Sequence, residues 1–251
     1  MRLRHCLFHE WRIDTEREGE KRMHIQKNRQ TEELSAAERI GRLPLAGMGN
    51  GWQKRAGICL VGVLVQGFFL SFLIKVNLGT DPYTFMNVSI AERIGWMFGN
   101  WQLAINVMFL VLVVLTSRLR YLGFGTLANM VLIGYTADFG CYLWNRFIPA
   151  SAFTEAATRI PIFIVALIGF LTAAAVYMNA GMGLSPYDAP PCILHEHAGK
   201  VPYFIIRILW DYGAILVGML AGGTPTVSNL IMAVALGPVI TLIGKAMRRI
   251  C

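Results

Sequence analysis

The chain carries very little charge over most of its length. Residues 56–251 hold 11 of the 23 Lys and Arg residues and 7 of the 15 Asp and Glu residues, and the first 55 residues hold the rest. A soluble domain carries about 25% charged residues, whereas 15% of this chain is charged and 55% is apolar. The scarcity of charge after residue 55 excludes an ordinary water-facing surface there and indicates a membrane protein.

The chain also lacks the motifs of several common chemistries. It contains no Walker A or GxGxxG stretch, so we expect neither ATP hydrolysis nor dinucleotide binding, and no cofactor. His195 and His197 flank Glu196 without the HExxH spacing that places two imidazoles on one helix face, so we expect no metal site. No nucleophile and base stand together, so we do not expect an enzyme. The five cysteines form no CxxC pair, so we expect no disulfide framework: Cys6, Cys59, Cys141, Cys192 and Cys251.

Long apolar runs are what the chain does contain. A membrane-crossing helix needs about 20 mostly apolar residues. Six stretches meet this need approximately: 56–76, 101–117, 121–143, 160–180, 202–221 and 226–246. Helices are expected because lipid offers no partner to backbone polar groups, and the runs lack the alternation of barrel strands. The predicted fold is therefore an all-α membrane protein with six transmembrane helices, whose main partner is the lipid bilayer.

The N-terminal segment, residues 1–55, is polar and basic. It has no apolar run near its start, so we expect no signal peptide. A flexible cytoplasmic tail is the simplest interpretation, although Thr31 could cap a helix over 31–42. Translation from Met23 or Met48 is an alternative that would remove much of this segment. The net charge of +8 lies largely here and at the span ends, where it suits an anionic inner leaflet, and it does not indicate nucleic-acid binding.

An internal repeat is the most informative pattern. Residues 77–95, NLGTDPYTFMNVSIAERIG, correspond to residues 181–199, GMGLSPYDAPPCILHEHAG, at an offset of 104. The shared motif consists of Gly79, Pro82 and Tyr83 in the first copy and Gly183, Pro186 and Tyr187 in the second. With small gaps the match continues, because Asn106 falls opposite Asp211 and Gly134 falls opposite Gly237. We therefore divide the membrane part into repeat 1 (56–146) and repeat 2 (147–251).

The basic residues that flank the spans predict the orientation. With the N-terminus in the cytoplasm, the inside ends carry Lys54, Arg55, Arg118, Arg120, Lys200, Lys245, Arg248 and Arg249. The outside ends carry Lys75, Arg93, Arg146 and Arg159. This bias favours both termini on the cytoplasmic side of a bacterial inner membrane. Each repeat then holds three spans, an odd number, so the second repeat would enter the membrane inverted relative to the first.

Each repeat is expected to contain a short helix after its first span. Asp81 and Ser185 are good N-cap residues, and each precedes a proline that suits the first helical position. The short helices are expected over 82–95 and 186–198, and the second should be broken or kinked by its adjacent prolines, 190 and 191. Their N-termini could face a central site and favour an anionic group there. Alternatively, both helices lie flat in the membrane interface and only cover the bundle.

Ionisable residues within the spans supply the candidate site, because an unpaired charge at mid-membrane is costly. Arg207 and Asp211 are four residues apart on one helix face, so they form either an internal structural pair or part of a substrate or proton site. Asp138 is either a further site residue or a carboxylate at the interface. Asn106 is of interest because its counterpart is Asp211. The candidate substrate or proton site therefore comprises Asp81, Asn106, Asp138, Ser185, Asp188, Arg207 and Asp211.

Several of these stretches resemble a known family. LIKVNLGTDPYTF, GFGTLANMVLIGYTADF, GMGLSPYDA, RILWDYGAILVGML and ALGPVI are similar, in order and spacing, to the bacterial YczE/YyaS/YitT-type integral membrane proteins, in particular the YczE-like branch. The resemblance covers about residues 56–247. The prolines at 190 and 191 depart from the pattern. The resemblance implies a multipass membrane architecture and does not imply a mechanism.

Two functions remain open from the sequence. A small secondary transporter or permease for a small polar or anionic solute is favoured by the repeats, the Gly-Pro turns and the charges within the spans. A non-transporting membrane partner, which stabilises or regulates another membrane protein, is favoured by the small size of the chain and its few buried charges. A homodimer is compatible with such a slim bundle.

Overall fold

The computed structural model describes residues 51–117, 121–198 and 201–235, and all regular structure in these ranges is α-helical. Most of the predicted tail over 1–55, including the helix predicted at 31–42, lies outside the described residues. The sixth apolar stretch, 226–246, is described only as far as residue 235, and residues 227–235 of it are helical.

The described helices follow the predicted order. They are α2 (Trp52–Val76), α3 (Pro82–Ile94), α4 (Phe98–Ser117), α5 (Phe124–Phe147), α6 (Ser151–Thr154), α7 (Ala156–Asn179), α8 (Ala189–Ala198) and α9 (Tyr203–Leu220). The four-residue helix α6 was not expected. It joins α5 to α7 across a short connection.

The adjacent prolines do not break the second short helix, and this prediction was wrong. The helix was expected from residue 186, but α8 begins at Ala189, so Pro190 and Pro191 fall in its first turn. Backbone donors in the first turn have no partner within a helix, so proline loses nothing there. Residues 186–188 form a turn instead, and the helix is consequently shorter than α3.

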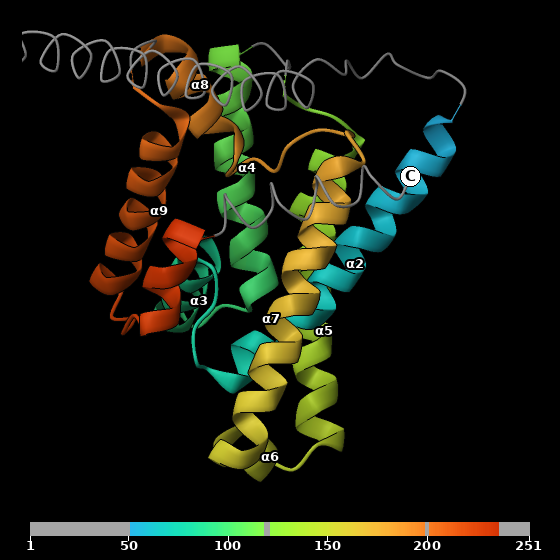
Figure 1. The fold of residues 1–251 in the computed structure, drawn as a ribbon, viewed down its shortest axis with the longest axis vertical. Helices are drawn as coiled ribbons and strands as arrows, with labels where there is room; N and C mark the ends of the chain where they lie inside the picture. The colour runs from blue at the N-terminus through green and yellow to red at the C-terminus, as the bar shows by residue number, and fades with distance from the viewer. Residues whose placement is uncertain (1–50, 118–120, 199–200, 236–251) are drawn as a thin grey trace, which may run out of the picture. The chain divides into compact units, whose positions relative to one another are not determined.

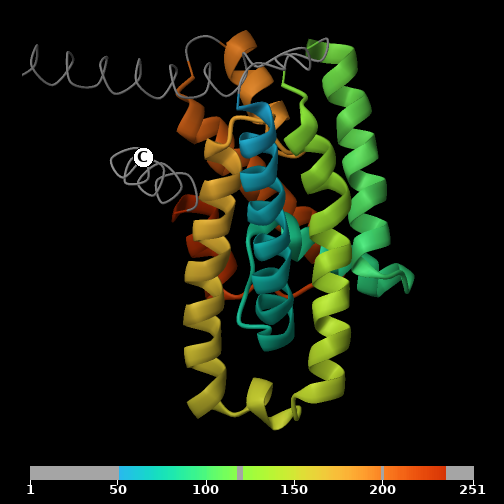
Figure 2. The same cartoon turned by 90° about the vertical axis from the view of Figure 1, so that its right-hand side faces the viewer.

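Helix α2 packs between α5 and α7 in a closely fitted core (Figure 2). Buried side chains of all three helices contact one another there, including Leu70 and Leu73 of α2, Ala137 of α5 and Phe170 of α7. The approach to α5 requires glycine, because a Cβ added at Gly67 would lie 2.8 Å from the Thr136 Cβ. Small residues that allow such contact are typical of helix packing in membranes.

Helices α3, α4, α8 and α9 form a second group of contacts, in which α3 packs against both α9 and α4, and α8 packs against the same two helices. Helices α2 and α7 run in opposite directions, and so do α4 and α9. In Figure 1, the chain descends along α2 and ascends along α7, and it ascends along α4 and descends along α9. Thus each short helix contacts a long helix of its own repeat and one of the other repeat.

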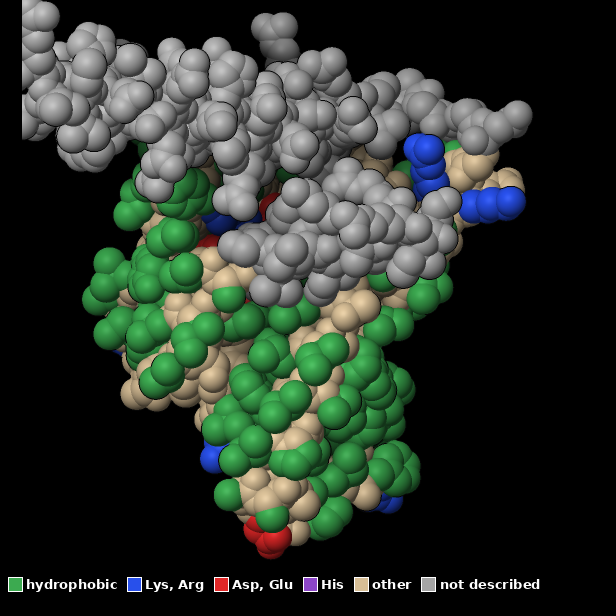
Figure 3. Space-filling view, in the orientation of Figure 1, with side chains coloured by type: hydrophobic (Ala, Val, Ile, Leu, Met, Phe, Trp, Pro, Cys, Tyr) green, Lys and Arg blue, Asp and Glu red, His purple; other side chains and the backbone are tan. Residues whose placement is uncertain are grey.

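Four of the described helices are long and apolar enough to cross a membrane: Trp52–Val76, Phe98–Thr116, Ala156–Asn179 and Tyr203–Leu220. Helix α5 is 24 residues long but is not among these four. On the face in Figure 3, hydrophobic side chains predominate below the grey atoms, and the few charged side chains lie mainly toward the upper and lower ends of the visible surface. Exposed residues on these helices are largely apolar, as a lipid-facing surface requires.

Candidate functional site

The two Gly-Pro turns have matching geometry. Asp81 caps α3 through its Oδ2, which accepts a hydrogen bond from the Thr84 backbone N–H at 3.0 Å. Ser185 occupies the equivalent position, and its Oγ accepts from the Asp188 backbone N–H at 3.3 Å. Both bonds span three residues, as expected of a residue that caps a helix or turn. The predicted N-cap role of Asp81 is therefore seen directly, and Ser185 supports the turn that precedes α8.

No residue type other than glycine fits at the two turn positions 79 and 183 without strain. Gly79 and Gly183 have φ values of +123° and +110°, which L side chains rarely adopt. A Cβ at Gly79 would lie 2.3 Å from Thr226 Oγ1, and one at Gly183 would lie 2.6 Å from the Gly123 backbone nitrogen. Each turn is therefore held against the start of a helix in the other repeat.

The tyrosines of the two motifs meet inside the bundle. The Tyr83 hydroxyl donates to Asn106 Oδ1 at 2.7 Å, and the Tyr187 hydroxyl donates to Asp211 Oδ1 at 2.8 Å. The two rings stack on each other, with centroids 4.1 Å apart and planes 21° apart. Two pairs that the repeat aligns in the sequence therefore make the same bond, and their rings form one contact between the repeats.

Repeat 2 surrounds its tyrosine with charge. Arg207 donates from Nη1 to Asp188 Oδ1 at 2.6 Å and from Nε to Asp211 Oδ2 at 3.1 Å. The Ser185 hydroxyl donates to the other oxygen of Asp188 at 2.8 Å. The Arg207 guanidinium also lies 5.5 Å from the centroid of the Tyr187 ring, within cation–π range. We call Asp188, Arg207 and Asp211 the charged cluster. It holds two carboxylates and one guanidinium, with both carboxylates hydrogen-bonded on both oxygens.

Repeat 1 has neutral residues at the matching positions. Gln102 and Asn106 on α4 correspond to Arg207 and Asp211 on α9, and both are almost fully buried. Gln102 Oε1 and Asn106 Nδ2 have no hydrogen-bond partner in the described part of the chain. The same is true of both amide atoms of Asn87, which lies one turn after Tyr83 on α3. The first repeat is thus neutral and unsatisfied where the second is charged and satisfied.

Asp81 links the two halves electrostatically. Burial raises the pKa of its carboxyl, the Thr84 hydrogen bonds oppose this rise, the nearby Asp188 carboxylate adds to it, and Arg207 opposes it. Asp81 Oδ1 has no hydrogen-bond partner among the described residues. Asp81 is therefore close enough to the charged cluster to respond to its charge.

Asp138 has a different environment from the other candidates. Its Oδ2 accepts a hydrogen bond from the Gly99 backbone N–H at 2.7 Å, at the beginning of α4. A carboxylate there satisfies a free helix donor and favours the positive end of the helix dipole. No described hydrogen bond or ion pair joins Asp138 to the charged cluster, so its visible role is to hold α4 against α5.

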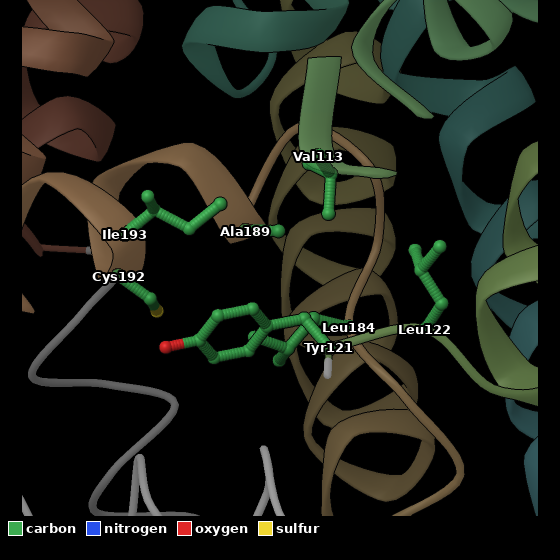
Figure 4. Close-up of a cluster of buried hydrophobic side chains, with 7 residues drawn as sticks. All are labelled: Val113, Tyr121, Leu122, Leu184, Ala189, Cys192 and Ile193. Carbon is green, nitrogen blue, oxygen red and sulfur yellow. The ribbon is translucent and has the colours of Figure 1, made fainter. Parts of the chain in front are cut away.

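The end of α4 and the start of α8 enclose an apolar cluster beside this site. Figure 4 shows that it draws side chains from α4, from the segment before α5, from the segment before α8 and from α8: Val113, Tyr121, Leu122, Leu184, Ala189, Cys192 and Ile193. The Tyr121 hydroxyl also donates to Glu196 on α8. Burial raises the pKa of the Cys192 thiol to about 11. These contacts fix α8, and with it the turn that carries Tyr187 and Asp188.

Sequence reasoning missed three parts of this arrangement. Asp188 was a candidate, but its bond to Arg207 was not anticipated, and neither were the tyrosine hydrogen bonds and their stacking. The third part is a pair of matching caps: Gly123 N–H donates to Thr126 Oγ1 at 3.0 Å, and Thr226 N–H donates to Asn229 Oδ1 at 2.8 Å. The offset of about 104 residues was the signal for the tyrosine bonds and the caps, because these occur at equivalent positions in both repeats. The Asp188–Arg207 bond has no counterpart in repeat 1 and gave no such signal.

The architecture and this buried polar centre define an all-helical integral membrane protein. The chain belongs to the Family of unknown function (DUF6198), whose model matches residues 53–245. The expected YczE-like resemblance is thereby confirmed.

Two relatives come from Bacillus subtilis (strain 168). The "Uncharacterized membrane protein YczE" is 30% identical over 140 residues, which cover 55% of this chain and 61% of that protein, so the match spans under two thirds of the relative. The "Uncharacterized protein YyaS" is 20% identical over 178 residues, which cover 70% of this chain and 85% of that protein. No solved structure matches the chain.

Proposed function

We propose that the protein is a small secondary transporter or permease of the bacterial cytoplasmic membrane that moves a small polar or anionic solute. In this proposal six spans form two inverted repeats of three, and both termini are cytoplasmic. The substrate site lies at the contact between the repeats, where inverted-repeat transporters commonly bind substrate.

The matched tyrosine hydrogen bonds carry this proposal. Tyr83 bonds to α4 and Tyr187 bonds to α9, and the two rings stack between the repeats. Equivalent bonds from equivalent residues are what a two-fold relation between the repeats requires. The polar side chains around this axis are buried, and buried polar groups within a membrane protein usually mark a pathway for solutes or protons.

Helix direction supports the inverted relation. Helices α2 and α7 occupy equivalent places in the repeats and run antiparallel, as do α4 and α9 (Figure 1). An odd number of spans in each repeat produces this geometry, whereas parallel repeats would run in the same direction.

A matched pair of cysteines tests the topology. Ile94→Cys and Ala198→Cys lie at equivalent exposed positions, each at the last residue of a short helix. We expect a membrane-impermeant thiol reagent to label Ile94→Cys in intact cells and to label Ala198→Cys only after the cells are permeabilised. The unsubstituted chain serves as the background control. Equal labelling of both variants in intact cells would overturn the inverted arrangement.

Transport is tested in two steps. Melting the purified full chain against small-molecule fractions of a bacterial lysate finds ligands, because a ligand that binds only the folded state raises the Tm. Counterflow of such a ligand in proteoliposomes then measures transport. We expect Asp211→Asn to remain folded in the membrane and to lose counterflow, since Arg207 loses one of its two carboxylates.

Asp138→Asn is the matched control for this experiment. An amide oxygen at residue 138 can still accept from Gly99, so counterflow should persist. A ligand that stabilises the protein without any counterflow would contradict transport. Unchanged counterflow in Asp211→Asn would remove Asp211 from the mechanism.

One observation favours the second function, that of a membrane partner. Both carboxylates of the charged cluster already pair with Arg207, so the cluster can act as a closed structural unit. Under this alternative, crosslinking in the membrane should recover a second membrane protein in stoichiometric amounts. Crosslinking that recovers only this chain would count against it.

A further inference from the structure

Two buried amides in repeat 1 have hydrogen-bonding capacity that no described residue uses. Asn87 is fully buried, and neither its Oδ1 nor its Nδ2 has a partner. Asn106 is 1% exposed; its Oδ1 accepts from Tyr83, but its Nδ2 has no partner. A buried polar group left without a partner costs about 1–3 kcal/mol. Three such atoms therefore represent a substantial cost in one small region.

Both amides belong to residues that neighbour Tyr83. Asn106 contacts it directly from α4, and Asn87 follows Tyr83 by one turn on α3. Tyr83 and Asn87 are four residues apart on α3, so their side chains share one face of the helix. Burial raises the pKa of the Tyr83 phenol, the Asn87 amide partly opposes this rise, and the Asp188 and Asp81 carboxylates add to it. We call Tyr83, Asn87 and Asn106 the amide site.

The equivalent positions of repeat 2 carry no unpaired amide, although the indole Nε1 of the neighbouring Trp210 has no partner among the described residues. Pro191 stands where the offset places the counterpart of Asn87, and Asp211 replaces Asn106 with both oxygens bonded. Repeat 2 also shows that the fold can satisfy these positions without a ligand. The unpaired amides of repeat 1 are therefore not a requirement of the fold.

The hydrogen-bonding groups and the charge of the amide site indicate which class of ligand it can bind. It offers one carbonyl oxygen as an acceptor and two amide nitrogens as donors, with no formal charge on any of its three residues. The guanidinium that could bind an anion, Arg207, is already engaged by Asp188 and Asp211. An anion would therefore lose its hydration without gaining an opposite charge, which is unfavourable. A cation would meet the Asp81 carboxyl, but burial raises the pKa of that group and so favours its neutral form.

We propose that the amide site binds a small neutral solute that carries both a hydrogen-bond donor and an acceptor, with a primary amide as the simplest example. This inference narrows the solute class of the proposed function, on which it rests only for identifying the bound solute as the transported one. Binding itself does not depend on transport.

Three probes of similar size and different charge test the proposal: acetamide, acetate and methylammonium. Each is added at about 50 mM to the purified full chain in detergent, where a ligand with a Kd of a few millimolar shifts the folding equilibrium measurably. We expect acetamide to raise the Tm by roughly 2–4 °C and the two ions to leave it unchanged. Acetamide that shifts the Tm no more than acetate would overturn the proposal and would leave water as the occupant of the site.

Variants test whether the acetamide-induced rise in Tm comes from binding at Asn87. Asn87→Leu should abolish the acetamide shift and should melt no lower than the unsubstituted chain, because it removes two unpaired polar atoms and keeps the branched shape of the side chain. If Asn87→Leu does not fold, Asn87→Ala replaces it, and the acetamide shift remains the readout. Asn179→Leu is the control, since Asn179 is exposed and bonds only within its own helix. A full acetamide shift in the Asn87 variant would overturn the site.

The results separate this inference from the proposed function. If the Asn87 variant loses the acetamide-induced rise in Tm and no solute shows counterflow, the amide site is supported and the transport function is contradicted. If an ion shows counterflow and acetamide does not raise the Tm, the transport function is supported and the amide site is contradicted.

Discussion

Repeat 1 and repeat 2 differ in the residues that surround the tyrosine of the shared motif. Each places a tyrosine after a Gly-Pro turn and bonds its hydroxyl to a long helix, but repeat 1 uses Asn106 and repeat 2 uses Asp211. Around Asp211 the hydrogen bonds are complete, whereas around Asn106 several groups are unpaired. This difference is the basis for the proposed division of roles, in which the charged cluster holds the centre together and the amide site binds a ligand.

The largest expected effect comes from breaking the charged cluster. Arg207→Gln leaves two buried carboxylates without their cation, and loss of one partner of a buried ion pair costs about 3–5 kcal/mol. We expect a large fall in Tm in detergent. The double variant Arg207→Gln/Asp211→Asn gives repeat 2 the residues of repeat 1, Gln102 and Asn106, and should recover much of the loss. A double variant less stable than Arg207→Gln would contradict the matched roles of the two helices.

The turn glycines come next. Gly183→Ala should lower the free energy of unfolding by about 2–4 kcal/mol, because its φ is positive and its Cβ would meet backbone atoms of Gly123. Gly79→Ala should cost somewhat less, since its Cβ would first meet the Thr226 and Ser228 side chains. Gly213→Ala is the control, because a Cβ there meets nothing within 4 Å. Equal Tm values for Gly183→Ala and Gly213→Ala would show that the turn is not fixed.

Removing each tyrosine hydroxyl separately compares the hydrogen bond of repeat 1 with that of repeat 2. Tyr187→Phe removes a hydrogen bond to a carboxylate and should cost about 1.5–3 kcal/mol, whereas Tyr83→Phe removes one to an amide and should cost about 0.5–1.5 kcal/mol. The rings and their stacking remain in both variants. Thermal melting of the two proteins side by side measures the difference. A larger loss for Tyr83→Phe would reverse the roles assigned to the repeats.

The smallest effect concerns the cap of α3. Burial raises the pKa of Asp81, so the folded state binds the proton more tightly than the unfolded state. Stability should therefore fall as the pH rises from the ordinary Asp value of about 3.9 through the higher folded value. Asp81→Asn keeps a good cap and removes this titration. Its Tm advantage over the unsubstituted chain should be larger at pH 8 than at pH 5, and an advantage that shrinks with rising pH would refute the sign.

The elements of the fold were largely predictable because the apolar runs and the repeat are strong patterns. The helix ends were less so. Pro190 and Pro191 were expected to break a helix, but a proline breaks a helix only beyond its first turn, and the sequence alone did not place that turn. The helical start therefore moved from residue 186 to Ala189.

The candidate site was predictable in its residues and not in its contacts. Arg207 and Asp211 are close in sequence, so their pairing followed from helix geometry. Asp188 reaches Arg207 only because α8 and α9 pack together, and Asp138 reaches Gly99 only because α5 packs against α4. Asn87 gave no signal at all, because a buried and unpaired amide is a property of its three-dimensional surroundings.

The flat contact between Tyr83 and Tyr187 has a mechanical consequence. Each hydroxyl is tied to the long helix beside its own ring, and the rings touch each other only through their faces. Offset-stacked rings tolerate a range of lateral positions at a cost of about 1 kcal/mol or less. Under the proposed transport function, a small lateral displacement of one ring over the other would therefore leave both hydroxyl bonds intact.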